Sequence, residues 1–400
     1  MEQSLSYVLV TPYTVAKSRT GGVLSRLLSR ISLELVGAQM VAMDQALAEA
    51  YATIIKTREK DEGINTSELL SSYIGQNLGP TGGVKHRSLL LLFRGEHPCD
   101  ELTKVVGSFQ KEIHMVENVI GMSIRDTYAD LIYTDEQEKE VLYFEPAVIT
   151  AQSQKEADKT LSLFSSWLPG QNNIVKNRPA EYYEKTQRSL VIIKPDNWKY
   201  ASSRPGMIID RFSRSGLRIV GIKVLNMSVS QALQFYGPTK EGLKAKLAPI
   251  YGMQARELLE GEFNVLLGDQ LQTILTDSFG DMYSEEQFER IVEFMAGIKP
   301  SNCKEEDREK PGLVKCMVLI YEGVDAIQKI RTILGATDPN KALAGTIRRE
   351  FGSNIRVNAA HASDSPESAH REMGVLKAEE NFNATLIKAY LESKLADPAL

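Results

Sequence analysis

The 400-residue chain has only three cysteines, five histidines and two tryptophans, and it contains no long apolar stretch. Cys99, Cys303 and Cys316 lack the paired spacing of a metal site, so we expect reduced thiols and not a disulfide framework. No run approaches the ~18–20 apolar residues of a membrane span, and the N-terminus has no signal-peptide pattern. These absences predict a cytoplasmic location and no membrane partner.

Positive charge is not in excess either. The formal net charge is −5, which argues against a dedicated nucleic-acid binder but leaves room for a local basic pocket that binds a small anion. Hydrophobic residues make up 42% of the chain and charged residues 25%, which is ordinary for globular protein. The length predicts two or three domains.

An internal repeat organises the chain. The segments 7–13 and 190–196 are both short apolar strands that end near a proline, and in both copies a helical segment and a second strand follow. The spacing between matching residues stays near 184, from Pro12 and Pro195 through to Tyr51 and Tyr236. Two unrelated strand–helix–strand units would rarely keep this spacing, so we interpret the pattern as a duplication.

Later segments match as well, because 89–95 resembles 316–323 and 105–107 resembles 333–335. Each copy is therefore predicted to run strand, helix, strand, long helical segment, strand, helix, strand. This order favours an antiparallel sheet with helices packed on it. We predict an α+β protein with two tandem ferredoxin-like (βαββαβ) domains.

The domain boundaries follow from composition. We expect a first domain over 1–165, a linker over 166–186 that contains proline, glycine and asparagine, and a second domain over 187–400. Two stretches look like insertions in the second domain: 239–285, which is rich in helix formers, and 301–311, which is charged. The tail has helical spacing and is expected to pack on a surface, through Ile387, Tyr390, Leu391 and Leu395.

The segment from 345 to 372 gathers the residues with most chemistry. His361 lies close in sequence to Ser363, Asp364 and Glu372, which can hydrogen-bond an imidazole. A carboxylate that fixes the tautomer of a histidine raises the basicity of its other nitrogen, so His361 is suited to accept a phosphoryl group. A lone histidine is more often structural, and His370, which has no such neighbours, is assigned to the surface.

Cationic and loop residues precede this segment. Arg331, Thr337 and Arg348 flank loop-like glycine-containing stretches whose N–H groups can face an anion. Guanidinium groups suit phosphoryl oxygens because they donate two hydrogen bonds in one plane. Each arginine taken alone is more often part of a solvated helix face. Lys194 ends an apolar strand, and its charge lies either at the sheet edge or in a pocket.

Together these motifs resemble the nucleoside diphosphate kinase family, over roughly residues 187–375. The resemblance rests on segments 193–196 (Ile-Lys-Pro-Asp), 204–212 (Arg-Pro-Gly-Met-Ile-Ile-Asp-Arg-Phe), 216–221 (Gly-Leu-Arg-Ile-Val-Gly), 335–339 (Gly-Ala-Thr-Asp-Pro), 345–348 (Gly-Thr-Ile-Arg) and 358–364 (Asn-Ala-Ala-His-Ala-Ser-Asp). The last string resembles the active-site signature of the family.

The resemblance implies a ping-pong reaction, in which ATP phosphorylates His361 and a nucleoside diphosphate then takes the phosphoryl group. Nucleoside tri- and diphosphates would be the partners, and Mg²⁺ would be held mainly by their phosphates, without a protein ligand. The implied catalytic residues are His361, Glu372, Ser363, Lys194 and Tyr236. The implied nucleotide-binding residues are Lys194, Phe288, Arg331, Thr337, Arg348, Ile355 and Asn358.

The first copy departs from this pattern. The sequence places Thr11 at the position of Lys194, Thr103 at that of Arg331, Val148 at that of His361 and Glu145 at that of Asn358, while Arg125 matches Arg348. We therefore expect the first copy to serve structure or regulation and to form an intrachain pseudo-dimer with the second, with further homo-oligomerisation open.

Two other functions remain open at this point. The chain could be a nucleotide-binding sensor or scaffold that retains the fold, or a histidine phosphocarrier that acts on proteins. The full set of residues around His361 favours the kinase over both.

Overall fold

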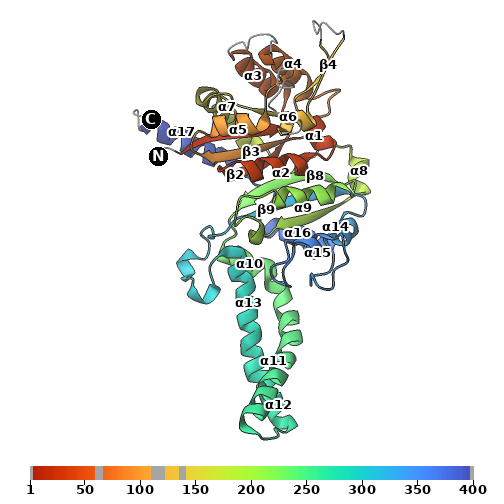
Figure 1. Cartoon of the computed structure of the whole chain (residues 1–400), viewed down its shortest axis with the longest axis vertical. Coiled ribbons are helices and arrows are strands. Elements are labelled where there is room, and N and C mark those ends of the chain that lie inside the picture. The colour runs from red at the N-terminus through yellow and green to blue at the C-terminus, as the bar shows by residue number, and fades with distance from the viewer. Residues whose placement is uncertain (1–2, 59–65, 110–121, 135–140, 397–400) are drawn as a thin grey trace. The chain divides into compact units, whose positions relative to one another are not determined.

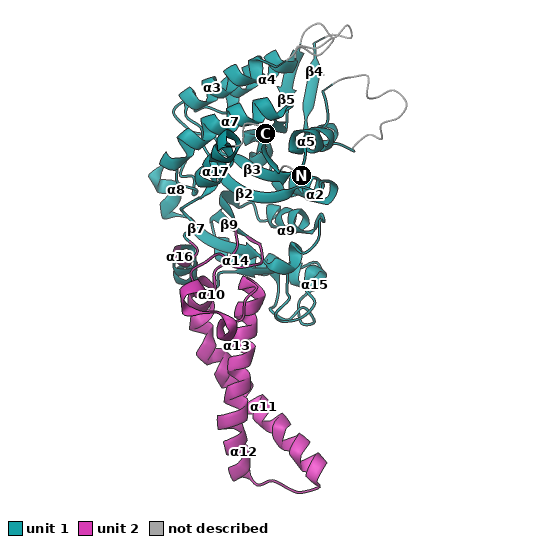
Figure 2. Cartoon of the chain, turned by 90° about the vertical axis from the view of Figure 1, so that its left-hand side faces the viewer, with its two compact units in different colours: residues 1–224, 317–373, 377–400 teal, residues 225–316, 374–376 magenta. Residues whose placement is uncertain are grey.

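A computed structural model describes residues 3–58, 66–109, 122–134 and 141–396 of the chain. The chain divides into two compact units, coloured separately in Figure 2. The first unit comprises residues 1–224, 317–373 and 377–400 and contains the sheets of both repeat copies. The second comprises residues 225–316 and 374–376 and contains the inserted helices.

Each repeat copy forms a four-stranded sheet. The first sheet has the order β2-β3-β1-β6 and the second the order β8-β9-β7-β10, so equivalent strands occupy equivalent places. This order, with helical connections between the strands, is that of a ferredoxin-like fold and confirms both the predicted fold class and the duplication. The strands are β1 (Ser4–Val10), β2 (Glu34–Val41), β3 (Ser88–Gly95), β6 (Val148–Thr150), β7 (Gln187–Ile193), β8 (Arg218–Leu225), β9 (Cys316–Gly323) and β10 (Ala360–Ala362).

The helices of the first copy lie between and after its strands, and a small β-hairpin follows the last short helix. These elements are α1 (Pro12–Ala16), α2 (Thr20–Arg30), α3 (Gln45–Lys56), α4 (Thr66–Asn77), α5 (Pro98–Val106), α6 (Ile124–Tyr128), β4 (Asp130–Tyr133), β5 (Val141–Glu145) and α7 (Gln154–Trp167). A 3-10 turn (Leu168–Gly170) and α8 (Ala180–Glu184) lead to the second copy. Its first-unit helices are α9 (Arg204–Ser213), α14 (Ala326–Leu334), α15 (Ile347–Phe351), α16 (Pro366–Val375) and α17 (Asn383–Ala396).

The pairing of strands corrects the sequence alignment of the two copies by one residue. Ile149 pairs with Leu9 in the first sheet, and His361 pairs with Ile192 in the second. Because β1 and β7 have the same length and start the two copies, Ile149 and not Val148 is the residue equivalent to His361. Ile149 is fully buried and apolar. The first copy therefore has no nucleophile at this position, as expected, although the residue expected there was wrong.

The two copies pack against each other through α2 and α9, which lie side by side in Figure 1. Glycines allow the close approach, since a Cβ on Gly21 would lie 2.4 Å from the backbone nitrogen of Asp210, and one on Gly206 would lie 2.2 Å from that of Ser25. The hydroxyl of Ser25 also donates to the carbonyl of Ser203. Side chains of both sheets join in one buried apolar cluster. That the two copies act as an intrachain pseudo-dimer stays a prediction.

The C-terminal helix α17 packs on the first copy, against α7, β1 and β2. Ile387 is fully buried in the apolar cluster of the first copy. Tyr390 and Lys394 both bond the carboxylate of Asp158, at 2.9 and 2.7 Å. The structure thus confirms that the tail is a helix that packs on a surface, although Leu395 is exposed and not part of the contact.

The second compact unit is built from helices, shown in magenta in Figure 2. They are α10 (Val229–Tyr236), α11 (Lys240–Phe263), α12 (Asp269–Leu275), the π-helical turn η5 (Thr276–Gly280) and α13 (Asp281–Ala296). Ion pairs join α11 to α13, among them Lys244 with Asp281. In the ranges that the structure describes, no helix is both long and apolar enough to cross a bilayer.

Candidate functional site

Strand β10 and helix α16 place the candidate nucleophile beside an acid. Nε2 of His361 lies 3.1 Å from Oε2 of Glu372, whose side chain is only 5% exposed. The hydroxyl of Ser363 donates to the same carboxylate oxygen at 2.7 Å, and Arg371 lies 3.4 Å from the other oxygen. A buried carboxylate held from two sides presents a fixed acceptor to the imidazole. When Nε2–H donates to Glu372, the lone pair of the ring lies on Nδ1.

The sequence-predicted phosphate residues come together around a cavity of about 570 Å³. The Nη1 atom of Arg348 donates to the carbonyl of Gly335 at 3.1 Å and lies 3.4 Å from the hydroxyl of Thr337. Its Nε and Nη2 atoms both donate to the carbonyl of Ala360, which fixes the plane of the guanidinium next to His361. The cavity is lined by Gln328, Arg331, Thr332, Leu334, Gly335, Ala336, Thr337, Lys341, Leu343, Thr346, Arg348 and Ala362.

Gly335 ends helix α14 with a φ of +85°, a conformation that favours glycine. A Cβ at this position would lie 2.5 Å from the hydroxyl of Thr346, so the turn also needs the missing side chain. The turn brings α14, which carries Arg331, against α15, which carries Arg348. The glycine therefore sets the spacing of two cationic side chains on one cavity.

Lys194 and Asn358 form a second group of predicted residues. The Nζ atom of Lys194 donates to Oδ1 of Asn358 at 2.7 Å and to the carbonyl of Arg356 at 3.2 Å. The amide of Asn358 in turn donates to the carbonyls of Thr337 and Ile355. Burial lowers the pKa of Lys194 to about 7, with a smaller contribution from the charge of Arg348. Asn358 thus ties the buried lysine to the loop that carries Thr337.

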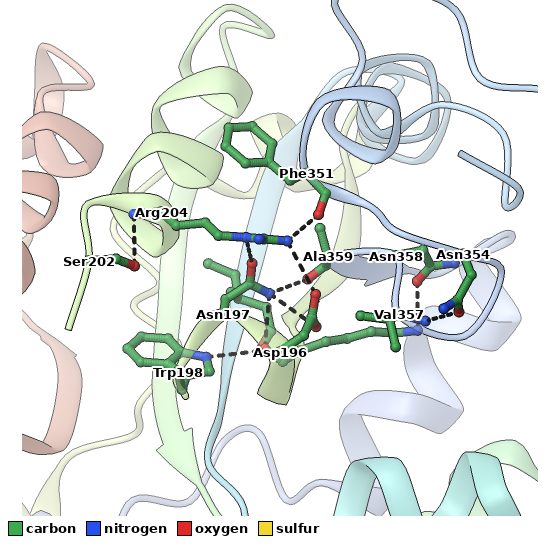
Figure 3. Close-up of polar contacts among 12 residues, drawn as sticks. Asp196, Asn197, Trp198, Ser202, Arg204, Phe351, Asn354, Val357, Asn358 and Ala359 are labelled. Atoms are coloured by element: carbon green, nitrogen blue, oxygen red, sulfur yellow. Dashed lines mark hydrogen bonds and ion pairs between the residues drawn. The ribbon is translucent and has the colours of Figure 1, made fainter. Parts of the chain in front are cut away.

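A polar network that sequence reasoning missed holds this group in place (Figure 3). The guanidinium of Arg204 donates to Oδ1 of Asn197 at 2.7 Å and to the carbonyl of Phe351, and it lies 3.4 Å from Asp196. The amide of Asn197 donates to the carbonyl of Ala359 at 2.7 Å. The network fastens the turn after β7 to the chain just before His361. Arg204 lies in a segment that carries the family resemblance, but the network closes on main-chain carbonyls, which a sequence does not reveal.

The remaining predicted residues lie elsewhere. Ile355 is in the first unit, in the loop after α15, with 61% of its surface exposed. Tyr236, the last residue of α10, and Phe288, on α13, belong to the second compact unit. Phe288 is 3% exposed, and Nζ of Lys240 lies 5.4 Å from its ring centre. Contacts of Tyr236 and Phe288 with a nucleotide stay predictions.

In the first copy, Thr11 takes the place of Lys194. It also donates a hydrogen bond, but to a carboxylate and not to an amide. The hydroxyl of Thr11 donates to Oε1 of Glu145 at 2.7 Å, as Lys194 donates to Asn358 in the second copy. The backbone positions differ from the sequence alignment, because the strand register places Pro146 and not Glu145 at the position of Asn358. The carboxylate of Glu145 nevertheless accepts the hydrogen bond from Thr11, as Oδ1 of Asn358 accepts the one from Lys194.

Comparisons with known proteins point to one family. A family model described as nucleoside diphosphate kinase matches residues 187–246 and 308–382. The nucleoside diphosphate kinase of Halorhodospira halophila is 35% identical over 187 residues, which cover 47% of this chain and 89% of that protein. The enzyme of the same name from Helicobacter acinonychis is 33% identical over 196 residues, which cover 49% of this chain and 98% of that protein.

Among solved structures, the chain is similar to the nucleoside diphosphate kinase of Aquifex aeolicus, with 26% identity and a TM-score of 0.31 over 48% of this chain and 94% of that chain. The match to the family model is interrupted at the inserted helices and includes the segment with His361. From the motifs, the family model and the two relatives together, the chain belongs to the nucleoside diphosphate kinase family.

Proposed function

We propose that the chain is an active nucleoside diphosphate kinase, which moves the γ-phosphoryl group of a nucleoside triphosphate to a nucleoside diphosphate through a phosphohistidine at His361. The observation that carries the proposal is the 3.1 Å contact between Nε2 of His361 and the buried Glu372. It supports a tautomer in which Nδ1 is the nucleophile and Nε2 keeps its proton.

The reaction then balances in two steps. Nδ1 of His361 attacks the γ-phosphorus, the bond to the bridging oxygen breaks, and the nucleoside diphosphate leaves with that electron pair. A second diphosphate attacks the phosphohistidine with a terminal phosphate oxygen, and Nδ1 recovers its lone pair. Phosphoryl transfer depends mainly on position and on neutralised charge, for which Arg331 and Arg348 are placed on the adjoining cavity.

The other predicted residues would bind the rest of the nucleotide. Lys194 and Asn358 are one hydrogen bond apart and are proposed to contact the sugar hydroxyls. Ile355 is exposed and is proposed to contact the base, and Tyr236 and Phe288 stay proposed contacts of the nucleotide. An apolar contact with a base face does not depend on hydrogen-bonding groups, which would make the enzyme tolerant of many bases.

Magnesium would enter with the nucleotide. In the described part of the chain, no group of three or more His, Cys, Asp or Glu side chains could hold a metal ion, and the cavity lining contains no carboxylate. This residue set fits an ion that phosphate oxygens and water hold, and the bound ion would neutralise part of the phosphate charge.

Steady-state kinetics test the proposal. The rate of GTP formation from ATP and GDP is measured over a grid of both concentrations, and a ping-pong reaction gives parallel double-reciprocal lines. His361→Ala should lose activity by more than ~1,000-fold, whereas His370→Ala, an exposed histidine on α16, should retain it. Nucleotide binding without transfer in the wild-type chain would contradict the proposal and would indicate a sensor or scaffold.

A further inference from the structure

The first copy contains a cavity of about 260 Å³ that is lined by cationic and hydroxyl side chains. Arg58, Lys104 and Arg125 supply the charge, and no carboxylate belongs to the lining among the residues that the structure describes. The described residues that line it are Arg58, Thr66, Leu70, Thr103, Lys104, Gly107, Ser108, Phe109, Arg125 and Gln152.

The two arginines of this cavity differ in their partners. Arg58 is neutralised, because its Nε and Nη2 atoms donate to both carboxylate oxygens of Glu156, at 3.0 and 2.6 Å. Arg125 makes no ion pair with any described residue, and its Nε atom is buried without a hydrogen-bond partner within the described part of the chain. Its guanidinium lies over the ring of Phe109, 3.8 Å from the ring centre, which fixes its plane.

Electrostatics make an unpaired cation costly here. Burial, and then the nearby charge of Arg58, lower the pKa of Arg125 from its ordinary value, so its charged form is destabilised. Arginine still remains protonated in proteins. A cation that keeps its charge in a partly buried cavity is stabilised when an anion takes the place of the missing carboxylate.

The cavity corresponds to the phosphate side of the second copy. Nη1 of Arg125 donates to the carbonyl of Gly107 at 2.5 Å, as Nη1 of Arg348 donates to that of Gly335. Gly107 ends α5 with a φ of +87° and Gly335 ends α14 with a φ of +85°, so the two turns have the same form. The first copy has therefore lost its nucleophile but has kept the arginine-bearing turn.

We propose that the first copy binds a phosphoryl anion in this cavity, through Arg125, Lys104 and the hydroxyl of Thr103, and does not turn it over. The cavity is smaller than the ~300–1,000 Å³ of sites for drug-sized ligands, so it holds a phosphate group or a short phosphate chain and not a buried nucleoside. The anion comes from inorganic phosphate, pyrophosphate or the phosphate tail of a nucleotide. The proposal does not depend on phosphoryl transfer at His361.

Calorimetric titration of the full chain tests this site. Arg348→Gln is used as the background, because we expect it to weaken phosphate binding in the second copy. At low ionic strength, inorganic phosphate, pyrophosphate and ATP are titrated separately, and we expect one remaining site for at least one of them. Adding Arg125→Gln should weaken this binding by about tenfold or more, the usual effect of losing a charged hydrogen bond.

Surface variants keep the test decisive if Arg125→Gln fails to fold. Lys104→Gln removes an exposed charge from the cavity and should weaken binding several-fold, whereas Lys159→Gln removes an exposed charge from α7 outside the cavity and should leave binding unchanged. Tighter binding of ATP than of pyrophosphate identifies a nucleotide tail as the ligand, and equal or weaker binding identifies the free anion. No binding of any of the three, or equal effects of Lys104→Gln and Lys159→Gln, overturns the proposal.

Discussion

His361 and Glu372 are joined by a 3.1 Å contact between Nε2 and Oε2, and Ser363 donates to the same oxygen. Glu372 lies on α16 and His361 on β10, so this contact connects the short edge strand β10 to the helix that follows it. The contact also selects which imidazole nitrogen faces away from the acid. The proposed chemistry at Nδ1 depends on this choice.

Glu372→Gln should slow transfer by about 10–100-fold, the usual cost of removing a carboxylate that orients a histidine. The amide can still accept from Nε2–H, but it carries no charge to stabilise an imidazole that gains positive character. Turnover numbers for ATP and GDP measure the effect. Ser363→Ala is the matched control, because Glu372 then keeps its contacts with His361 and Arg371, and a loss below tenfold is expected. A wild-type rate in Glu372→Gln would remove the acid from the mechanism.

Arg348→Lys should raise KM for nucleotides by about tenfold or more. Lysine keeps the charge, but it cannot donate at once to Gly335 and Ala360 and still present a flat group to the cavity. Arg349→Lys provides a control in the same helix, since the guanidinium of Arg349 donates to the carbonyl of Pro339 and does not line the cavity. Similar KM values for the two variants would show that charge alone matters at Arg348.

The buried Lys194 should make stability depend on pH. Its pKa is about 7 in the folded chain, against an ordinary value of 10.5, so between these values the unfolded chain binds more protons at this residue. The free energy of unfolding therefore falls as the pH is lowered from about 10.5 to about 7, and the contribution of Lys194 is constant outside this range. One proton changes the free energy of unfolding by at most about 1.4 kcal/mol for each pH unit.

Lys194→Met removes this pH dependence, so the variant should gain stability relative to the wild type when the pH is lowered from 9.5 to 7. Urea unfolding at both values measures the change, with Lys159→Met as an exposed control that should show none. A difference between Lys194→Met and the wild type that does not vary with pH would mean that Lys194 keeps an ordinary pKa.

Gly206→Ala should lower the free energy of unfolding by about 1–3 kcal/mol, because the new Cβ would meet the backbone of Ser25 at the contact of α2 with α9. Gly75→Ala is the control in another helix, α4, where no atom lies within 4 Å of the new Cβ, and it should raise stability by about 0.5–1 kcal/mol. Denaturant unfolding of both variants gives the two values. If both substitutions stabilise the chain, the two copies do not pack through α2 and α9 in solution.

The sequence was sufficient to predict the duplicated sheet and the group around His361, because these depend on strand periodicity and on residues close together in the chain. It was insufficient at β6, where Ile149 and not Val148 is equivalent to His361. The hairpin β4–β5 precedes this strand and has no matching segment in the second copy, so the sequence alone does not fix the alignment there. The register is given by the hydrogen-bonded pairing of β6 with β1.

Long-range contacts also lay beyond the sequence. Arg204 acts through the carbonyl of Phe351 and through Asn197, and no pattern of residue types marks a backbone acceptor 147 positions away. The helical spacing of the tail predicted an apolar face, but the side chain of Ile387 gave no indication that it would be buried in the first copy. The sequence matched Arg125 with Arg348, but it did not show that both guanidinium groups donate to the carbonyl of a helix-ending glycine.

The phosphorylated intermediate at His361 is tested most directly by labelling. The purified chain is incubated with ATP that carries label on the γ-phosphate, and unlabelled GDP is then added. We predict that the protein acquires an acid-labile label and that this label moves into GTP. His361→Ala should acquire no label, whereas His370→Ala should behave like the wild type. Label that stays on the protein after GDP is added, or that still appears in His361→Ala, would contradict the account.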